Sequence, residues 1–532
     1  MAPAGFVKPV GIAVAPLDPL RSNITKPWGV TMETLALLTN GFSQALTVPN
    51  LLSALIGCFL GTVVGVLPGI GPSTTVALMI PISFAMNPAT ALIMMMGVYC
   101  GAMYGGAITS ILVNVPGEAS SVMTAVDGYP LAKQGRGGVA MVLCQVGSFI
   151  GGSLSIVGLM IVAMPLAMFA LEFGPAENFS VMFFALILAA TLISESMLRG
   201  LTALVMGLIL ASIGTDLQTG VGRLTMGIPE LLDGIDNVVV IIGVFGVGEV
   251  LWYVVSAYGK TAGAIERIGA GRWIPNRAEW RSNWGPIFRG SLTGFLTGLL
   301  AAGSVLGSFL AYSFEKRLSK NPERFGKGAL EGITACESAN NSSTGGALIP
   351  LLTLGIPHSG TTAVLLTVLT MYGLKPGPQM MIDQAPLMWT VISSLYIANI
   401  ILVVMNLPAV GIFIRILDIP LRFLMPIILV FASVGAYSIN TSLTDVIMVL
   451  LFGVLGFFMR WSGFTPVAMV LGMVLGERLE QSLRQALMIS SNGVLIFLTK
   501  PISLFFLLLT AAVVAVDIVT RKKGRVADDK EG

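Results

Sequence analysis

Polar side chains gather in one of the most apolar parts of the sequence. The run NNSSTGGALIPLLTLGIPHSGTT (340–362) places two Asn, two Ser and a Thr in a row, and ends in Pro-His-Ser-Gly-Thr-Thr. Hydroxyls, amides and free backbone groups of this kind bind carboxylate oxygens or a hard cation such as Na⁺. Because polar and helix-breaking residues are costly in hydrocarbon, we expect these residues to line a site inside the protein.

The first half of the chain carries a related pair of polar segments. GVLPGIGPSTT (65–75) and NVPGEASS (114–121) correspond to CESANNSSTGG (336–346) and GIPHSGTT (355–362). Gly-Gly-Ala begins at position 105 and again at position 345, an offset of 240 residues. A single motif of this type is often only helix packing and capping, but its duplication at a nearly constant offset favours a binding site.

Each of these segments is predicted to break a helix at membrane depth, so that the two breaks face each other. Helix N-termini there would bind an anion, while freed carbonyls and Asn or Ser oxygens would hold a cation. The predicted substrate-binding residues are Ser73, Thr74, Asn114, Pro116, Gly117, Ser120, Ser121, Asn340, Asn341, Ser342, Pro357, Ser359, Gly360, Thr361 and Thr362. The predicted cation-coupling residues are Gly69, Gly71, Glu337, Asn340 and Ser343.

Three other polar positions have weaker arguments. His358 is the only His and aligns with Gly117, so the duplication does not require it. An interfacial position for His358 competes with a contact to substrate or proton. Glu118 could tune selectivity or lie exposed in a loop, and Asp127 is predicted to lie in a solvated hairpin turn.

The composition is that of a membrane protein. Of the 532 residues, 55% are hydrophobic and 11% are charged, and the mean hydropathy is +0.87, whereas a soluble domain is about 25% charged. Apolar runs such as 150–171, 238–255 and 502–519 are long enough to span a bilayer as helices. We therefore predict an all-α polytopic membrane protein. A net charge of +3 argues against a nucleic-acid partner.

The basic residues predict how the two halves are oriented. The loop 316–327 of the second half carries five Lys or Arg, while the equivalent turn 82–90 carries none. Since basic residues concentrate in cytoplasmic loops, this difference favours two inverted repeats over two parallel ones. The predicted units are a disordered N-terminal extension (1–31), a first membrane repeat (32–216), a connecting helix and cytoplasmic loop (217–288), a second membrane repeat (289–480), a C-terminal transmembrane helix (481–520) and a basic cytoplasmic tail (521–532).

Several kinds of chemistry have no motif in this chain. There is no G-x-x-x-x-G-K-[ST] loop for ATP, and one His allows neither an H-E-x-x-H zinc site nor a His-based triad. An intramembrane hydrolase would have to use Ser73, Ser120 or Ser343 without a paired base, so we predict that the protein is not an enzyme. A passive channel remains the alternative, although two unlike polar halves fit an occluding carrier better.

Three long segments resemble one known family. GVLPGIGPSTTVALMIP (65–81), YGGAITSILVNVPGEASSVMTAVDGYPLAKQGRGGVAM (104–141) and ESANNSSTGGALIPLLTLGIPHSGTTAVLL (337–366) are similar to the large membrane subunit of the tripartite tricarboxylate transporters, the TctA family. The resemblance extends from Met32 to about residue 510 and leaves out the first 31 residues.

The resemblance implies a function that the spacing does not show. It implies a secondary carrier of the bacterial inner membrane, with roughly a dozen transmembrane helices, that imports citrate-like carboxylates on a Na⁺ or H⁺ gradient. It also implies a small TctB-like membrane partner, a periplasmic TctC-like binding protein, no prosthetic cofactor, and elevator-like movement as a mechanistic hypothesis. Because no basic residue stands within the polar breaks, an anionic substrate would depend on helix N-termini, hydroxyls and a co-bound cation.

Overall fold

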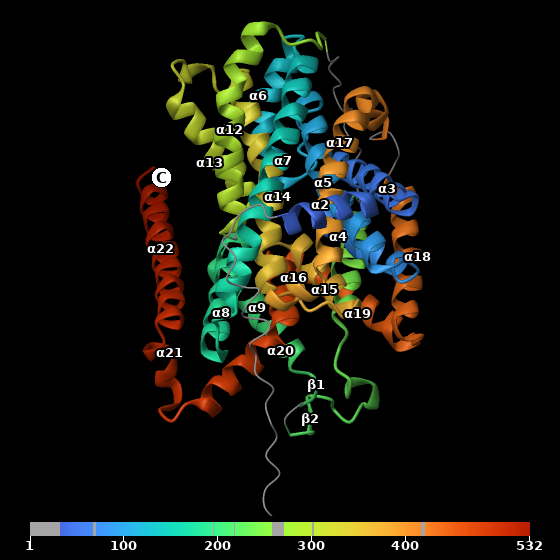
Figure 1. Ribbon diagram of the computed structural model, residues 1–532, viewed down its shortest axis with the longest axis vertical. Coiled ribbons are helices and arrows are strands. Elements are labelled where there is room, and N and C mark those ends of the chain that lie inside the picture. The colour runs from blue at the N-terminus through green and yellow to red at the C-terminus, as the bar shows by residue number, and fades with distance from the viewer. Residues whose placement is uncertain are drawn as a thin grey trace, which may run out of the picture.

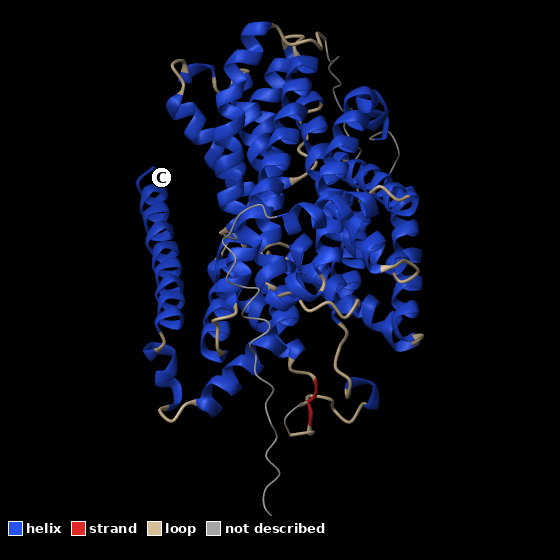
Figure 2. Cartoon of the chain, viewed as in Figure 1, coloured by secondary structure: helices blue, strands red, loops and turns tan. Residues whose placement is uncertain are grey.

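The protein is a bundle of helices, and the described residues contain strands only in one short hairpin (Figures 1 and 2). The structure, a computed structural model, describes residues 32–67, 71–194, 196–216, 219–257, 271–300, 303–416 and 421–531. The predicted extension 1–31 therefore lies outside the described residues. The abundance of helix follows from the bilayer, where each backbone polar group must find its partner inside its own segment.

The first half of the chain forms a series of helices that ends before the hairpin. Their bounds are α2 (Met32–Ala45), α3 (Val48–Val66), α4 (Pro72–Ser83), α5 (Pro88–Leu112), η1 (Ala119–Ser121), α6 (Val122–Lys133), α7 (Gly137–Ala170), α8 (Pro175–Ile193) and α9 (Met197–Ala211). The hairpin β1 (Gly214–Thr215) and β2 (Gly222–Arg223) is antiparallel and is followed by η2 (Pro229–Leu231).

A connecting helix and a second series follow. The connecting helix consists of α10 (Asn237–Ile241), the π-helical turn η3 (Ile242–Val247) and α11 (Gly248–Ala257). The second series is α12 (Arg277–Leu299), α13 (Gly303–Leu318), η4 (Pro322–Arg324), α14 (Leu330–Leu354), α15 (Gly360–Met371), α16 (Pro378–Asp383), α17 (Ala385–Ile416), α18 (Leu421–Asn440), α19 (Leu443–Trp461), α20 (Pro466–Ile489), η5 (Gly493–Leu495), α21 (Ile496–Thr499) and α22 (Pro501–Glu531).

Equivalent helices in the two series pack in equivalent ways. Helices α5 and α14 both have 25 residues, and α6 and α15 both have 12. Helix α3 packs along α5, and α12 packs along α14. A Cβ on Gly61 would collide with the backbone oxygen of Val98, and a Cβ on Gly294 would collide with that of Ala339. Small residues thus bring each pair of helix backbones into direct contact, as is typical in membranes.

Seven helices of the described residues are long and apolar enough to cross a membrane. They are 48–66, 88–112, 137–170, 237–256, 385–415, 443–461 and 501–519. Five further apolar helices are shorter, including α4 and α15 with 12 residues each. Twelve residues of helix span only about 18 Å, against a hydrocarbon core of about 30 Å. These lengths confirm a polytopic all-α membrane protein without giving the dozen full spans that were expected.

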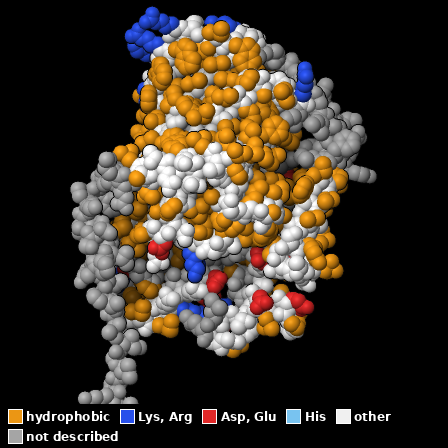
Figure 3. Space-filling model, turned by 45° about the vertical axis from the view of Figure 1, so that its right-hand side comes forward, with side chains coloured by type: hydrophobic (Ala, Val, Ile, Leu, Met, Phe, Trp, Pro, Cys, Tyr) orange, Lys and Arg blue, Asp and Glu red, His pale blue; other side chains and the backbone are white. Residues whose placement is uncertain are grey.

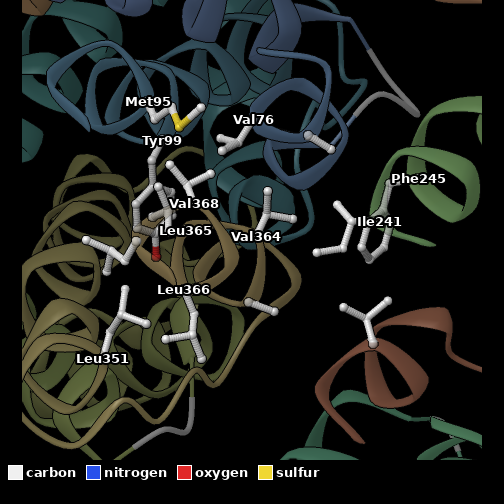
Figure 4. Close-up of a cluster of buried hydrophobic side chains, with 14 of the residues drawn as sticks. Val76, Met95, Tyr99, Ile241, Phe245, Leu351, Val364, Leu365, Leu366 and Val368 are labelled. Atoms are coloured by element: carbon white, nitrogen blue, oxygen red, sulfur yellow. The ribbon is translucent and has the colours of Figure 1, made fainter. Parts of the chain in front are cut away.

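A common apolar core holds the two short helices in place. In Figure 4, Val76 of α4, Tyr99 of α5 and Val364 and Leu365 of α15 point toward one another, with Ile241 of α10 beside them. All of these side chains are buried. The outer surface is also apolar: Figure 3 shows hydrophobic side chains over much of the face, with Lys and Arg at its upper end. A buried core inside an apolar coat is what a bilayer environment requires.

The structure corrects several expected boundaries. The break predicted at 336–346 is wrong, because α14 runs without interruption from Leu330 to Leu354. Its residues form hydrogen bonds along the helix, and the chain turns only at Gly355. Helix α12 begins at Arg277, inside the expected connecting loop. The predicted C-terminal helix 481–520 is also shifted, since α20 continues to Ile489 and α22 begins at Pro501.

Candidate functional site

The N-termini of α4 and α15 meet, one from each half of the chain. A Cβ at Gly360, the first residue of α15, would lie 3.3 Å from the Cβ of Ser73 in the first turn of α4. The first N–H groups of a helix lack intrahelical partners, and the helix dipole makes this end positive. Two such ends at one place favour an anion. Gly71 is the N-cap of α4, and Gly69 lies outside the described residues.

Three hydroxyls at these two N-termini are free to bind a ligand. Thr74 and Thr361 are buried, and Ser73 is half-buried. None of the three side chains has a hydrogen-bond partner among the residues that the structure describes. Hydroxyls in this position can donate to the oxygens of a carboxylate while the backbone N–H groups donate alongside them.

Two neighbouring hydroxyls are already used by the helix itself. Ser359 is the N-cap of α15, and its hydroxyl accepts from the Thr362 N–H (3.2 Å). In return, the Thr362 hydroxyl accepts from the Ser359 N–H (2.9 Å), which completes a capping box. Capping, the simpler interpretation of these hydroxyls, therefore accounts for Ser359 and Thr362. It leaves Thr361 as the free member of this turn.

The segment before α15 is a tight reversal at the end of α14. Gly355 adopts a left-handed conformation (φ 67°), and the Ile356 N–H donates to the Pro350 carbonyl (3.1 Å). Together with the bond from the Gly355 N–H to the Leu351 carbonyl (3.1 Å), this bond satisfies two of the last carbonyls of the helix. Pro357 and His358 follow and are buried. The His358 ring lies 4.0 Å from the Cβ position of Gly303 at the start of α13, which brings a third helix N-terminus to the site.

The break after α5 has the same backbone pattern. Asn114 is left-handed (φ 57°), and the Val115 N–H donates to the Thr109 carbonyl (3.3 Å). The Asn114 side chain is exposed, so its structural contribution is this turn. Pro116 is half-buried, and Gly117 packs so closely on the Gly65 carbonyl that any side chain would collide with it.

The first turn after this break is capped by a carboxylate. Glu118 is the N-cap of η1 and accepts from the Ser120 N–H (3.2 Å) and from the Ser120 hydroxyl. The Ser121 hydroxyl donates to the Glu118 carbonyl (2.7 Å) and accepts from Ser110 (3.1 Å). Both predicted hydroxyls are thus engaged within their own half. The turn itself contacts α13 and α14 of the second half.

A buried carboxylate with incomplete hydrogen bonding lies on the face of α14 toward α6. Glu337 is fully buried; its Oε1 accepts from the Thr124 hydroxyl, and its Oε2 has no partner among the described residues. The Asn340 side chain lies beside this carboxyl, but neither amide atom has hydrogen-bond geometry with it or with any other described residue. A carboxylate in such surroundings is stable only when it is protonated or holds a cation.

The other polar residues of this run hold helices together. The Asn341 amide donates to the Ser148 hydroxyl of α7 (2.8 Å), and the Ser342 hydroxyl donates to the Ser291 carbonyl of α12 (2.7 Å). The Ser343 hydroxyl donates to the Asn340 carbonyl within α14 (2.7 Å). The structure therefore separates the predicted group: Asn340 stays with Glu337, while Asn341 and Ser342 point to neighbouring helices. No group of three His, Cys, Asp or Glu that could hold a metal ion occurs among the described residues.

Asp127 corrects the interpretation of its segment as a solvated turn. It is fully buried and accepts hydrogen bonds from the N–H groups of Gly326 (2.8 Å), Gly328 (2.7 Å) and Ala329 (2.9 Å) and from the Tyr312 hydroxyl (2.8 Å). Asp127 thereby ties α6 of the first half to the start of α14. The partners lie about 200 residues away, so no local pattern could have revealed this role.

Arg478 is a second residue that the sequence did not reveal. Its guanidinium lies against the reversal after α14, where a Cβ on Gly355 would be 2.8 Å from Arg478 Nη1. The sequence places no basic residue within the breaks, but α20 brings the Arg478 guanidinium next to the second break. The signal in the sequence was only an Arg near the end of a predicted span.

The comparison with family models identifies one family. The sequence model of the "Tripartite tricarboxylate transporter TctA family" matches residues 51–471. A protein of Agrobacterium vitis, "Uncharacterized 52.8 kDa protein in TAR-I ttuC' 3'region", is 42% identical over 489 residues, which cover 92% of this chain and 97% of the relative. A second A. vitis protein, "Uncharacterized protein in TAR-II ttuC' 3'region", is 45% identical over 214 residues, covering 40% of this chain and 87% of the relative. No solved structure matches the chain.

Proposed function

Because this chain belongs to the tripartite tricarboxylate transporter TctA family, we propose that it is the large membrane subunit of a binding-protein-dependent secondary carrier. Its substrate is a citrate-like tricarboxylate or a related small carboxylate, and a Na⁺ or H⁺ gradient drives the uptake. Its partners are a small TctB-like membrane subunit and a periplasmic TctC-like binding protein. It acts in the bacterial inner membrane as a carrier and not as an enzyme.

The observation that carries this proposal is the meeting of the α4 and α15 N-termini. Both helices are too short to cross the bilayer, so each has an end within membrane depth. Backbone N–H groups and the hydroxyls of Ser73, Thr74 and Thr361 supply donors for a carboxylate there. Interrupted helices of this kind are how secondary transporters bind anionic groups near the midplane.

Glu337 and Asn340 are our candidates for cation coupling. Glu337 Oε2 and Asn340 Oδ1 are buried and have no hydrogen-bond partner among the described residues. A proton or Na⁺ bound there would replace the missing hydrogen bonds. The nearby Glu118 carboxylate adds negative charge to the same region. Binding the cation first would lower the electrostatic cost of admitting a multiply charged anion.

The charged loops support one orientation. The loop 319–329 and the start of α12 lie at one end of the bundle, and β1–β2 with the second half of α20 lie at the other (Figure 1). Since the former carry many Lys and Arg, the positive-inside tendency makes that end cytoplasmic. The other end then faces the periplasm and the binding protein. Alternating access through an elevator-like displacement of the two short helices fits this arrangement.

Uptake into proteoliposomes tests the proposed function. The chain would be reconstituted with its small partner and offered radiolabelled citrate, tartrate and succinate, with and without the binding protein, under imposed Na⁺ or H⁺ gradients. We expect saturable uptake that requires both the binding protein and a gradient. Uptake that is indifferent to both would contradict the carrier and favour a passive channel.

A further inference from the structure

A polar cavity opens beside the reversal that ends α14. Its volume is about 230 Å³, near the lower end of the ~300–1,000 Å³ typical of small-molecule sites. The polar residues that line it come from α8, α14 and α20 and are Asn178, Thr353, Arg478, Gln481, Ser482 and Gln485. The turn 376–378 closes one wall. Apolar side chains such as Phe173, Met182 and Ile356 complete the lining, so the cavity can hold a small molecule that carries polar groups.

Arg478 supplies this cavity with a cationic charge that is not neutralised. No carboxylate of a described residue lies within salt-bridge distance of its guanidinium. By contrast, Arg484 on the same helix pairs with Asp216 (3.0 Å) and Glu480 (2.6 Å), and Arg223 of the hairpin also pairs with Glu480 (2.7 Å). Two arginines thus engage Glu480, and the Glu477 carboxylate accepts from the Gln481 amide (3.0 Å).

The cavity lies between the surface and the second break. Leu354 and Ile356 line the cavity, and Ile356 lies only four residues before Gly360, the first residue of α15. The cavity belongs to the end of the bundle that carries β1–β2, opposite the basic loops (Figure 1). In the orientation given above, that is the side from which a binding protein delivers its ligand.

We propose that this cavity is an outer subsite that captures a carboxylate of the substrate on Arg478 before it reaches the α4–α15 site. This inference rests on the proposed function. A guanidinium binds a carboxylate through two parallel N–H donors, and the Gln485 amide lines the same cavity as a further polar partner. Capture at Arg478 also resolves the lack of a cation within the breaks themselves, because the anion is first desolvated beside a positive charge.

Substitution of Arg478 tests the subsite in the uptake assay. For the carboxylate that the unmodified protein transports, R478Q should raise KM about tenfold or more, since a charge-assisted hydrogen-bonded pair is lost. The maximal rate should change much less, and R478K should lie between the two. R484Q, on the same helix but already neutralised by two carboxylates, is the matched control and should stay within about twofold. An unchanged KM in R478Q would overturn the subsite while leaving the carrier function intact, whereas no uptake by the unmodified protein would overturn both.

A second measurement does not depend on the folding of the Arg478 variants. The native Cys58, Cys100, Cys144 and Cys336 are all buried, so S482C adds a thiol in the cavity that a negatively charged thiosulfonate can reach. We expect citrate to protect this thiol and the uncharged trimethyl ester of citrate not to protect it. Equal labelling with and without citrate, at citrate concentrations that saturate uptake, would exclude occupation of the cavity by the substrate.

Discussion

The segments that follow α5 and α14 form the same backbone turn with different side chains. Both helices end at a left-handed residue, Asn114 in one and Gly355 in the other, and in both the next N–H donates to the carbonyl six residues earlier. Both following turns start at an N-cap, Glu118 in the first and Ser359 in the second. In the first turn the Ser120 hydroxyl donates to the Glu118 carboxylate and the Ser121 hydroxyl to the Glu118 backbone carbonyl. In the second turn the Thr361 hydroxyl has no partner among the described residues.

The helices before the two turns, α5 and α14, also differ in their side chains, and α14 again carries the polar groups that are free. At an offset of 240 residues, Glu337 and Asn340 of α14 correspond to Gly97 and Cys100 of α5. The duplication therefore repeats the backbone arrangement, in which two helices are broken and packed through glycines. The side chains at equivalent positions of the two halves differ. This difference in side chains indicates that the two halves need not contribute equally to anion and cation binding. Substitutions in each half can therefore be tested separately.

The largest expected effect concerns the anchor that only the first half has. Asp127 binds three backbone N–H groups and Tyr312, while Val368 stands at the position of α15 offset by 241 residues. D127A should lower the free energy of unfolding by about 3–5 kcal/mol, because buried donors lose a charged acceptor. The measurement is chemical unfolding in detergent. D233A, at an exposed acidic residue, is the control and should change stability by less than about 0.5 kcal/mol.

The next effect separates coupling from substrate binding. E337Q keeps the volume and the Thr124 contact but removes the charge, so cation-driven uptake should fall by about tenfold or more while unfolding changes by less than ~1.5 kcal/mol. Uptake rates under Na⁺, H⁺ and no gradient measure the coupling. E118Q, in the cap of the first break, serves as the comparison and should retain the gradient dependence. A gradient response of E337Q equal to that of the unmodified protein would remove Glu337 from the coupling site.

Substituting each of the two left-handed residues tests how far the two turns share the same backbone requirement. G355A should cost about 1–2 kcal/mol of stability, since the residue is left-handed and its Cβ would lie 2.8 Å from Arg478. N114G should change stability by no more than about 0.5 kcal/mol, because Gly accepts the same conformation and the Asn side chain is exposed. Thermal unfolding of the two variants provides the test. A larger loss in N114G than in G355A would assign Asn114 a side-chain role that this structure does not give it.

The smallest effect distinguishes a ligand hydroxyl from a capping hydroxyl. T361A should weaken carboxylate affinity about fivefold with little change in stability, because the Thr361 hydroxyl has no hydrogen-bond partner among the described residues. T362A should instead cost about 1 kcal/mol of stability through loss of the capping box. Paired binding and unfolding measurements on both variants decide between them. Loss of stability in T361A without loss of affinity would contradict the ligand role.

Much of the frame could be predicted because it depends on short-range patterns. Apolar runs predict spanning helices, and Pro or Gly at repeated positions predicts where they end. The turns at Gly355 and at 114–118 were located in this way. The predicted break at Asn340 failed because polar residues can stay helical when neighbouring helices supply partners, as Ser148 and Ser291 do. That compensation is a property of tertiary packing.

The sequence by itself determined the membrane class, the duplication and the positions of the α4 and α15 N-termini, since these follow from composition and local spacing. It also indicated the family, through three long segments that resemble its members. Only the tertiary structure decided which polar groups remain free. Asp127 accepts hydrogen bonds from backbone N–H groups about 200 residues away, and one Glu337 oxygen has no partner among the described residues. Helix α20 brings Arg478 to the turn after α14. Hydrogen bonds and ion pairs depend on distances between atoms, and for residues far apart in the chain those distances are set by how the helices pack.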